Sequence, residues 1–318
     1  MISRSRVSLR VAERSWNYRC AGRASESTIP YARRAWAGLR WLVDGSFRTN
    51  DGVTLRYTTV GAGRAVVFVH GWQQDARQWR PVVERLTGCL RVTYDHRGHG
   101  RSEDSASGAT VHRLAVDLAE LLADLELTDV TLVGHSMGCS VIWAYLDLFG
   151  PADVRALVFV DQSPVMVTGP FWNADAALDA GAMLSAEQLS DMVHGLRSPE
   201  HRADVVRQLV STMVSDSFRG DQLDETVEWN LRVDGEFASA LLADHASHDW
   251  RPLVSRIELP VLVIAGSAST MPWRGSRWIA NRVPGSIFEL IDGGSHMLMV
   301  ETPDVAAGLL AKFLELTA

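Results

Sequence analysis

Ser136 stands in a setting that favours nucleophilic chemistry. It lies at the centre of Gly134–Gly138 (GHSMG), a G-x-S-x-G motif. The motif follows an apolar run at Val130–Val133 and opens a helical pattern over Met137–Phe149. A strand, a sharp turn and a helix in this order expose the serine hydroxyl at the end of the strand. The sequence therefore predicts Ser136 as a nucleophile, with the backbone N–H of Met137 as one donor to an oxyanion.

A histidine near the carboxyl end of the sequence is the candidate general base. His296 closes a Gly-Gly-Ser-His turn that directly follows the apolar run Ile287–Ile291. A base that takes the proton of the serine follows it in the chain order of this motif. The sequence contains ten histidines, so a single one is more often structural. Here the strand end, the glycine turn and the chain order together favour a catalytic role for His296.

The second oxyanion donor is predicted in the segment His70-Gly71-Trp72, which follows the apolar run Ala65–Val69. In a parallel sheet this turn lies beside the turn that carries the serine. Acyl transfer needs two N–H groups aimed at the developing oxyanion. We assign the second to the backbone of Trp72, and we interpret the side chain of His70 as a brace for the loop.

Together with Asp95–Ser102 (DHRGHGRS), these motifs resemble the α/β-hydrolase superfamily, and within it the serine esterases often labelled non-haem chloroperoxidases. The resemblance covers residues 47–163 and 256–318. It implies a doubly wound, mostly parallel sheet and a serine nucleophile, with no metal or organic cofactor. The two histidines and the aspartate of Asp95–Ser102 also suggest a metal site. However, no third ligand is identifiable, and the resemblance implies a loop braced by Asp95 and Arg97.

The acid that orients the histidine departs from the family pattern. The family usually places it in a G-x-x-D turn after the penultimate strand, but here Gly266–Ser269 ends in serine. A serine cannot stabilise an imidazolium by charge, so either the site is impaired or the acid comes from elsewhere. Asp161 is the candidate, because it ends the run Ala156–Val160 and parallel strands end at one edge. Some branches of the superfamily take their acid from this strand. The alternative is that Asp161 only caps the turn that follows.

The elements that must position these residues alternate between short apolar runs and helical patterns, which predicts an α/β fold with helices on both faces of the sheet. Further buried strands are expected at Leu90–Tyr94 and Val261–Ala265, and a hairpin is signalled by Asp51-Gly52. A helix is expected behind Thr110 as its N-cap. Residues 164–255 interrupt the pattern with several helices, which we interpret as a cap inserted into the fold.

The domain boundaries follow from these patterns and from the charge. Residues 1–46 are predicted as an Arg-rich, poorly ordered extension, and its first 40 residues hold nine Arg against two Glu. They lack the apolar core of a secretory signal. Residues 47–163 and 256–318 form the predicted core, and 164–255 the cap. The cap holds 15 acidic residues and six arginines, a net charge of −9.

Composition excludes several classes of protein. The 318 residues carry a net charge of −7, which argues against nucleic-acid binding. No apolar run reaches the ~18 residues that indicate a membrane span. The three cysteines form no CxxC motif, which fits a reducing compartment and predicts a cytoplasmic location without a zinc finger.

The sequence thus predicts a serine hydrolase that cleaves a neutral, partly apolar carboxylic ester or lactone, with Asp161 orienting His296. Two alternatives stay open: a cofactor-independent oxygenase or other reaction on the same Ser/His/Asp site, and a non-catalytic ligand receptor of this fold. Some apolar side chains of the cap are expected to line the substrate pocket. The candidates are Phe171, Trp172, Met183, Met192, Met213 and Trp229, with Trp250 and Trp273 near the end of the cap.

Overall fold

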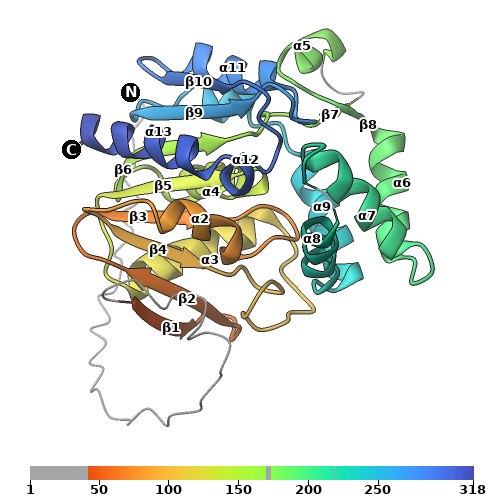
Figure 1. Ribbon diagram of the computed structural model, residues 1–318, viewed down its shortest axis with the longest axis horizontal. Helices are drawn as coiled ribbons and strands as arrows, with labels where there is room; N and C mark the ends of the chain where they lie inside the picture. Colours follow the sequence, from red (N-terminus) through yellow and green to blue (C-terminus); the bar gives the residue numbers. More distant parts are fainter. Residues whose placement is uncertain (1–41, 170–172, 219) are drawn as a thin grey trace, which may run out of the picture. The chain divides into compact units, whose positions relative to one another are not determined.

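An eight-stranded sheet forms the centre of the computed structural model, which describes residues 42–169, 173–218 and 220–318 (Figure 1). The strand order is β1-β2-β4-β3-β5-β6-β9-β10. Strand β2 pairs antiparallel with both β1 and β4, and all other neighbours are parallel. The strands are β1 (Leu42–Arg48), β2 (Thr54–Val60), β3 (Ala65–Val69), β4 (Leu90–Tyr94), β5 (Val130–His135), β6 (Val154–Val160), β9 (Val261–Gly266) and β10 (Ile287–Ile291).

The six apolar runs predicted as buried strands form β3, β4, β5, β6, β9 and β10, and the ends differ by at most two residues. The first boundary was wrong. Strand β1 begins at Leu42, so residues 42–46 belong to the sheet rather than to the N-terminal extension. This edge strand (LVDGSFR) is mostly exposed and has no apolar run. Its backbone pairing with β2, rather than burial of its side chains, holds it in the sheet. The rest of the predicted extension lies outside the described residues.

Helices cover both faces of the sheet (Figure 1). Helices α3, α4, α10 and α11 lie side by side on one face, and α2, α12 and α13 lie on the other. Thr110 caps α3 as predicted, because its hydroxyl accepts the Arg113 N–H. The core helices are η1 (Ala76–Trp79), α2 (Arg80–Val83), α3 (Val111–Asp124), α4 (Met137–Phe149), α10 (Arg251–Val254), α11 (Trp273–Arg282), α12 (Leu298–Glu301) and α13 (Pro303–Leu316).

The segment inserted between β6 and β9 is mainly helical. Its two ends meet where Val165 pairs with Asp249 and where the Trp250 N–H donates to the Pro164 carbonyl at 2.8 Å. Two short strands that were not predicted pair within it. Its elements are β7 (Val167–Thr168), α5 (Ala174–Asp179), β8 (Leu184–Ser185), α6 (Ala186–Arg197), α7 (Arg202–Met213), α8 (Asp221–Leu231) and α9 (Gly235–Ser247).

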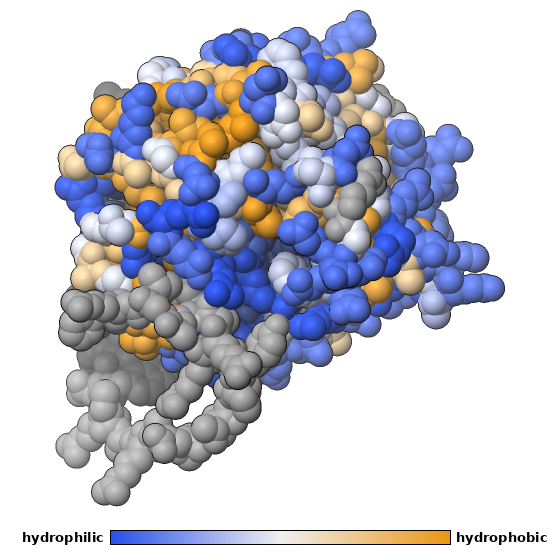
Figure 2. Space-filling view, in the orientation of Figure 1, coloured by the Kyte–Doolittle hydropathy of each residue, from blue (hydrophilic) through white to orange (hydrophobic). Residues whose placement is uncertain are grey.

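This helical segment, called the cap below, lies against the loops that leave the carboxyl ends of the strands (Figure 1). Phe237 of α9 packs on the His99 ring, with 6.1 Å between the ring centroids. The Met297 N–H donates to the Met213 carbonyl at 3.2 Å. In Figure 2 the outer side of the cap, at the right, is mostly hydrophilic. Within the described ranges, no helix combines the length and apolar character that a membrane crossing requires.

Candidate active site

Ser136 occupies a strained turn between β5 and α4. Its φ of 52° and ψ of −124° lie in a region that residues other than glycine rarely adopt. The turn is tight enough to require both motif glycines. A Cβ at Gly138 would lie 2.3 Å from the Val69 carbonyl oxygen, and one at Gly134 would lie 2.7 Å from the Cys139 nitrogen. The local sequence therefore folds into the strand–turn–helix that the motif predicted.

Asp161 and His296 meet at the carboxyl edge of the sheet, although 135 positions separate them in the sequence. The distance from His296 Nδ1 to Asp161 Oδ2 is 2.7 Å. Both side chains are buried. Asp161 follows β6, and its φ of 52° is also left-handed. A carboxylate in this position holds the Nδ1–H tautomer of the ring, which leaves Nε2 as the basic nitrogen.

Two further donors hold the carboxylate of Asp161. The Gly266 N–H donates to Oδ1 at 3.1 Å, and the Ser269 hydroxyl donates to Oδ2 at 2.5 Å. The Ser269 oxygen in turn accepts the Met271 N–H at 3.0 Å. Sequence reasoning singled out Ser269 only as a missing acid, and no pattern indicated that its hydroxyl contacts Asp161.

The residue before Ser136 contacts the candidate base. His135 Nε2 lies 2.9 Å from the His296 carbonyl oxygen, and the two rings are 4.5 Å apart at their centroids. Burial, with a smaller effect from His296, holds the pKa of His135 well below its usual value, so its ring is neutral. Its Nε2–H then donates to His296, and its Nδ1 accepts from the Gln78 amide at 3.3 Å. Sequence reasoning missed the contact of His135 with the candidate base.

The loop after β3 brings the backbone of Trp72 next to the serine turn. Gly71 lies against Ser136, because a Cβ added to this glycine would be 3.3 Å from Ser136 Cβ. The Gln74 N–H closes the turn on the Gly71 carbonyl at 3.2 Å. Within the part of the chain that the structure describes, the N–H groups of Trp72 and Met137 have no hydrogen-bond acceptor. Both are therefore available to an oxygen bound in front of Ser136.

His70 and the segment Asp95–Ser102 brace this loop. His70 Nε2 accepts the His96 N–H at 3.0 Å, and burial lowers the pKa of His70 to about 4. Arg97 is fully buried and pairs with Asp117 at 2.7 Å. Among the described residues, no group of three or more potential ligands is arranged to bind a metal ion.

The cap is tied to the loops that carry the candidate residues. The Trp72 indole N–H donates to the Ala238 carbonyl of α9 at 2.9 Å. On the other side, Glu301 accepts the Ser215 N–H at 3.0 Å and the Ser295 hydroxyl at 2.6 Å, and it also contacts the Ser215 hydroxyl. Ser295, the residue before His296, and Ser215, which follows α7, therefore share one carboxylate.

The side chains predicted to line the pocket have different surroundings. Trp250 packs in the core with Trp143, and Trp229 lies under the Arg77 guanidinium, 4.2 Å from ring centroid to carbon. Met183 and Trp273 are exposed. Phe171 and Trp172 lie outside the described residues.

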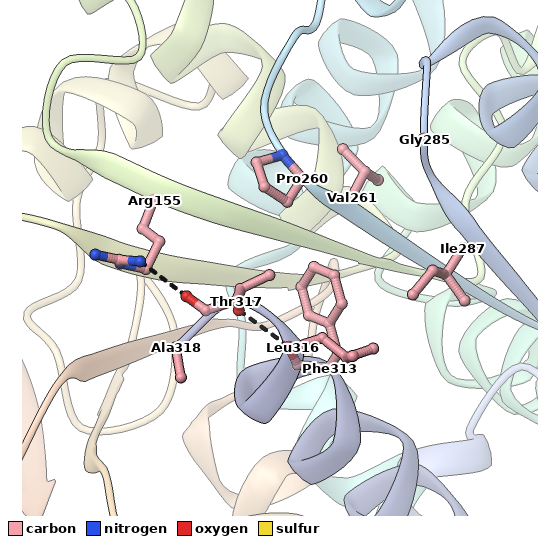
Figure 3. A pocket seen from close by; sticks show the side chains of 9 residues that line it. All are labelled: Arg155, Pro260, Val261, Gly285, Ile287, Phe313, Leu316, Thr317 and Ala318. Carbon is pink, nitrogen blue, oxygen red and sulfur yellow. Dashed lines mark hydrogen bonds between the residues drawn. The ribbon is translucent and has the colours of Figure 1, made fainter.

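One cavity of about 420 Å³ lies away from these residues (Figure 3). Its lining comes from the beginnings of β6, β9 and β10 and from the end of α13. Arg155 reaches into this region and donates to the Thr317 carbonyl at 2.8 Å. The cavity is therefore at the opposite end of the strands from Ser136 and has no part in the candidate site.

Comparisons with known proteins define the family. The model of the alpha/beta hydrolase fold matches residues 64–303, and the chain therefore belongs to this family of enzymes. A non-heme chloroperoxidase of Kitasatospora aureofaciens is 28% identical over 260 residues, which are 78% of this chain and 90% of the relative. A 3-oxoadipate enol-lactonase of Acinetobacter baylyi is 27% identical, over 79% of this chain and 88% of that protein.

Solved structures agree on the fold. The bromoperoxidase of Bacillus anthracis superposes with a TM-score of 0.78 at 23% identity and covers 86% of this chain and 100% of its own. An esterase of Exiguobacterium antarcticum has the same TM-score at 19% identity, with the same coverage of both chains. These likenesses support the mostly parallel sheet and its flanking helices.

Proposed function

We propose that this enzyme hydrolyses a neutral, partly apolar carboxylic ester or lactone through an acyl-enzyme intermediate on Ser136. The observation that carries the proposal is the 2.7 Å contact between His296 Nδ1 and Asp161 Oδ2, at the same strand edge as the strained Ser136. A serine, a histidine and a buried carboxylate in this chain order are the components of acyl transfer.

The first half of the reaction forms the acyl-enzyme. Ser136 Oγ attacks the carbonyl carbon of the substrate while His296 Nε2 accepts the hydroxyl proton. The carbonyl oxygen becomes an oxyanion, which the N–H groups of Trp72 and Met137 stabilise. Asp161 stabilises the imidazolium that has formed. The C–O bond then breaks, and the leaving alkoxide takes the proton from His296.

The second half releases the acid. His296 takes a proton from a water molecule, whose oxygen attacks the acyl carbon. The tetrahedral intermediate collapses, Ser136 recovers its proton from His296, and the carboxylic acid leaves. With a lactone, the alcohol and the acid are parts of one product. Besides the substrate and water, these steps use side-chain and backbone groups of the chain.

The substrate class is supported by charge and by the relatives. The cap carries a net charge of −9, which disfavours polyanionic substrates. Proteins named esterase and enol-lactonase are among the similar ones. Both names describe cleavage of a C–O bond next to a carbonyl.

The test compares the wild-type chain with Ser136→Ala on a panel of p-nitrophenyl esters and lactones, together with labelling by a fluorophosphonate probe. Ser140→Ala is the matched control, because Ser140 is a buried serine one turn along α4. We expect Ser136→Ala to abolish hydrolysis and labelling while Ser140→Ala retains both. Labelling that persists in Ser136→Ala contradicts the proposal. Dioxygen consumption with heteroaromatic substrates would indicate the oxygenase, and ligand binding without turnover would indicate the receptor.

A further inference from the structure

We propose that Ser269 is a positioning residue for Asp161, a role that rests on the proposed function. The turn after β9 brings the Ser269 hydroxyl within 2.5 Å of Asp161 Oδ2, the oxygen that also faces His296 Nδ1. A hydroxyl therefore stands where the family resemblance places the acid, and it contacts the acid supplied by the neighbouring strand.

The hydrogen bonds of Ser269 determine which way its proton points. The hydroxyl oxygen accepts the Met271 N–H at 3.0 Å, and a carboxylate is an acceptor only. The single hydroxyl proton is therefore donated to Asp161. With this bond, Oδ2 has two donors and Oδ1 has one, so protein donors take the place of water around a carboxylate that is 1% exposed.

The backbone of Asp161 explains why its side chain needs such support. Its φ of 52° is unfavourable for a residue with a Cβ, and such conformations persist only when surrounding contacts hold them. Those contacts come from Gly266, the last residue of β9, and from Ser269 in the turn that follows. The end of β9 and its turn thus hold the carboxylate that faces His296.

A purely structural role for Ser269 is the competing explanation, since its bond to the Met271 N–H also closes the turn. The two roles differ in what they do to His296. If the hydroxyl shares the charge of Asp161, removing it makes the carboxylate a stronger acceptor for His296 Nδ1–H and raises the proton affinity of the Asp161–His296 pair. A turn closure alone affects neither quantity.

Other titratable groups lie near the Asp161–His296 pair, and the substitutions at Ser269 do not change them. His135 faces His296 from the serine turn. From the cap, His245 of α9 has its pKa lowered by burial and, to a smaller extent, by the charges of His248 and His296.

The variants are Ser269→Ala, together with Ser269→Thr and Ser269→Val, which have nearly the same shape but differ in the hydroxyl. Ser267→Ala is the matched control. Ser267 lies in the same turn, donates to Asp292 at 3.1 Å and accepts the Gly293 N–H at 2.8 Å, but it contacts neither Asp161 nor His296. Like Ser269, it donates one hydrogen bond to a carboxylate and accepts one from a backbone N–H, but its carboxylate, Asp292, lies outside the candidate site.

We expect Ser269→Ala and Ser269→Val to lower kcat for esters roughly tenfold, because the carboxylate of Asp161 loses a hydrogen bond that holds its orientation. The acid limb of the pH–rate profile should move to higher pH in both. Ser269→Thr should restore the rate and the profile, and Ser267→Ala should resemble the wild type. If the Thr and Val variants have the same rate and the same acid limb, the hydroxyl has no positioning role.

A measurement without turnover separates this inference from the proposed function. In the Ser136→Ala background, the NMR resonance of the His296 Nδ1 proton reports its hydrogen bond to Asp161. We expect this resonance to shift in Ser269→Val and to remain in Ser269→Thr and Ser267→Ala. An unchanged resonance in Ser269→Val overturns the inference even if the enzyme is an esterase. A shifted resonance supports it even if no ester of the panel is hydrolysed.

Discussion

His135 holds the backbone of His296, with 2.9 Å between the imidazole Nε2 and the carbonyl oxygen. The same histidine directly precedes Ser136. One peptide unit therefore connects the proposed nucleophile to a group that fixes the proposed base. The side chain of Gln78 extends this support. Its Nε2 donates a hydrogen bond to His135 Nδ1, and its Oε1 accepts the Gly71 N–H at 3.4 Å. The three loops of the candidate site are thus joined by neutral hydrogen bonds below the reacting groups.

Replacing the acid tests which strand end supplies the charge. Asp161→Asn keeps the shape but loses the charge that orients and stabilises the His296 cation. We expect kcat to fall by about 10⁴, as the same change does in a serine-protease triad. Steady-state kinetics on the best ester of the panel measures it.

The double variant Asp161→Asn with Ser269→Asp returns the carboxylate to the turn after β9. Because the Ser269 side chain ends 2.5 Å from Asp161 Oδ2, the oxygen that faces His296 Nδ1, we expect the double variant to recover activity over Asp161→Asn alone. Asp292→Asn is the control, since this carboxylate contacts Ser267 but not the pair. Near-normal activity of Asp161→Asn would show that the acid is another residue.

The buried histidines predict a loss of stability in mild acid. Burial lowers the pKa of His70 to about 4 and the pKa values of His99 and His245 to about 3. In the unfolded chain each takes a proton near pH 6.5. Between about pH 6.5 and pH 4 the unfolded state therefore binds more protons, so the free energy of unfolding falls as the pH falls. Each such histidine contributes a slope of up to about 1.4 kcal/mol per pH unit.

Urea denaturation between about pH 7.5 and pH 4.5 measures this slope. His245→Gln should flatten it, because one buried group no longer titrates in the unfolded state alone. His194→Gln, at an exposed position of α6, should leave it unchanged. Equal slopes in the His245 variant and the wild type would contradict the expected neutral state of this ring.

The close contact of α4 with β3 predicts that one methyl group added at Gly138 strongly destabilises the protein. In Gly138→Ala the new Cβ would lie 2.3 Å from the Val69 carbonyl oxygen, so the helix must move away from the strand. We expect a destabilisation of several kcal/mol, about the upper range for single substitutions, and loss of activity. Gly308→Ala is the control, because nothing lies within 4 Å of its Cβ position in α13. It should stabilise by about 0.5–1 kcal/mol. Thermal unfolding of both variants checks the contrast.

Glu301 binds both the cap and the loop of His296, so weakening its hydrogen bonds should lower the stability of the cap where the two meet. Glu301→Gln keeps the shape but weakens the bonds from Ser215 and Ser295. We expect a loss of about 1–2 kcal/mol, since hydrogen bonds to a charged group are involved. Amide hydrogen exchange should rise around residues 213–217 more than elsewhere. Glu315→Gln, at an exposed position of α13, is the control. Uniform exchange across the cap would argue against this connection.

The inner parallel strands, such as β3, β5, β6 and β9, were predictable because they are buried on both faces and therefore read as continuous apolar runs. Ser136 and Asp161 were found as candidates for the same reason, since each directly follows such a run. Strand β1 was missed because it is an exposed edge strand whose pairing, not its side chains, holds it in place. The roles of Ser269 and His135 depend on contacts between residues more than 100 positions apart, which no local pattern contains.

The left-handed backbone of Ser136 sets stability against activity at one position. Glycine adopts a φ of 52° without the penalty that a Cβ carries, so Ser136→Gly relieves strain in the turn and removes the proposed nucleophile in the same change. A library of variants selected only for thermal resistance would therefore be enriched in inactive proteins at this codon. Any effort to make this enzyme more robust must select for turnover and for folding together.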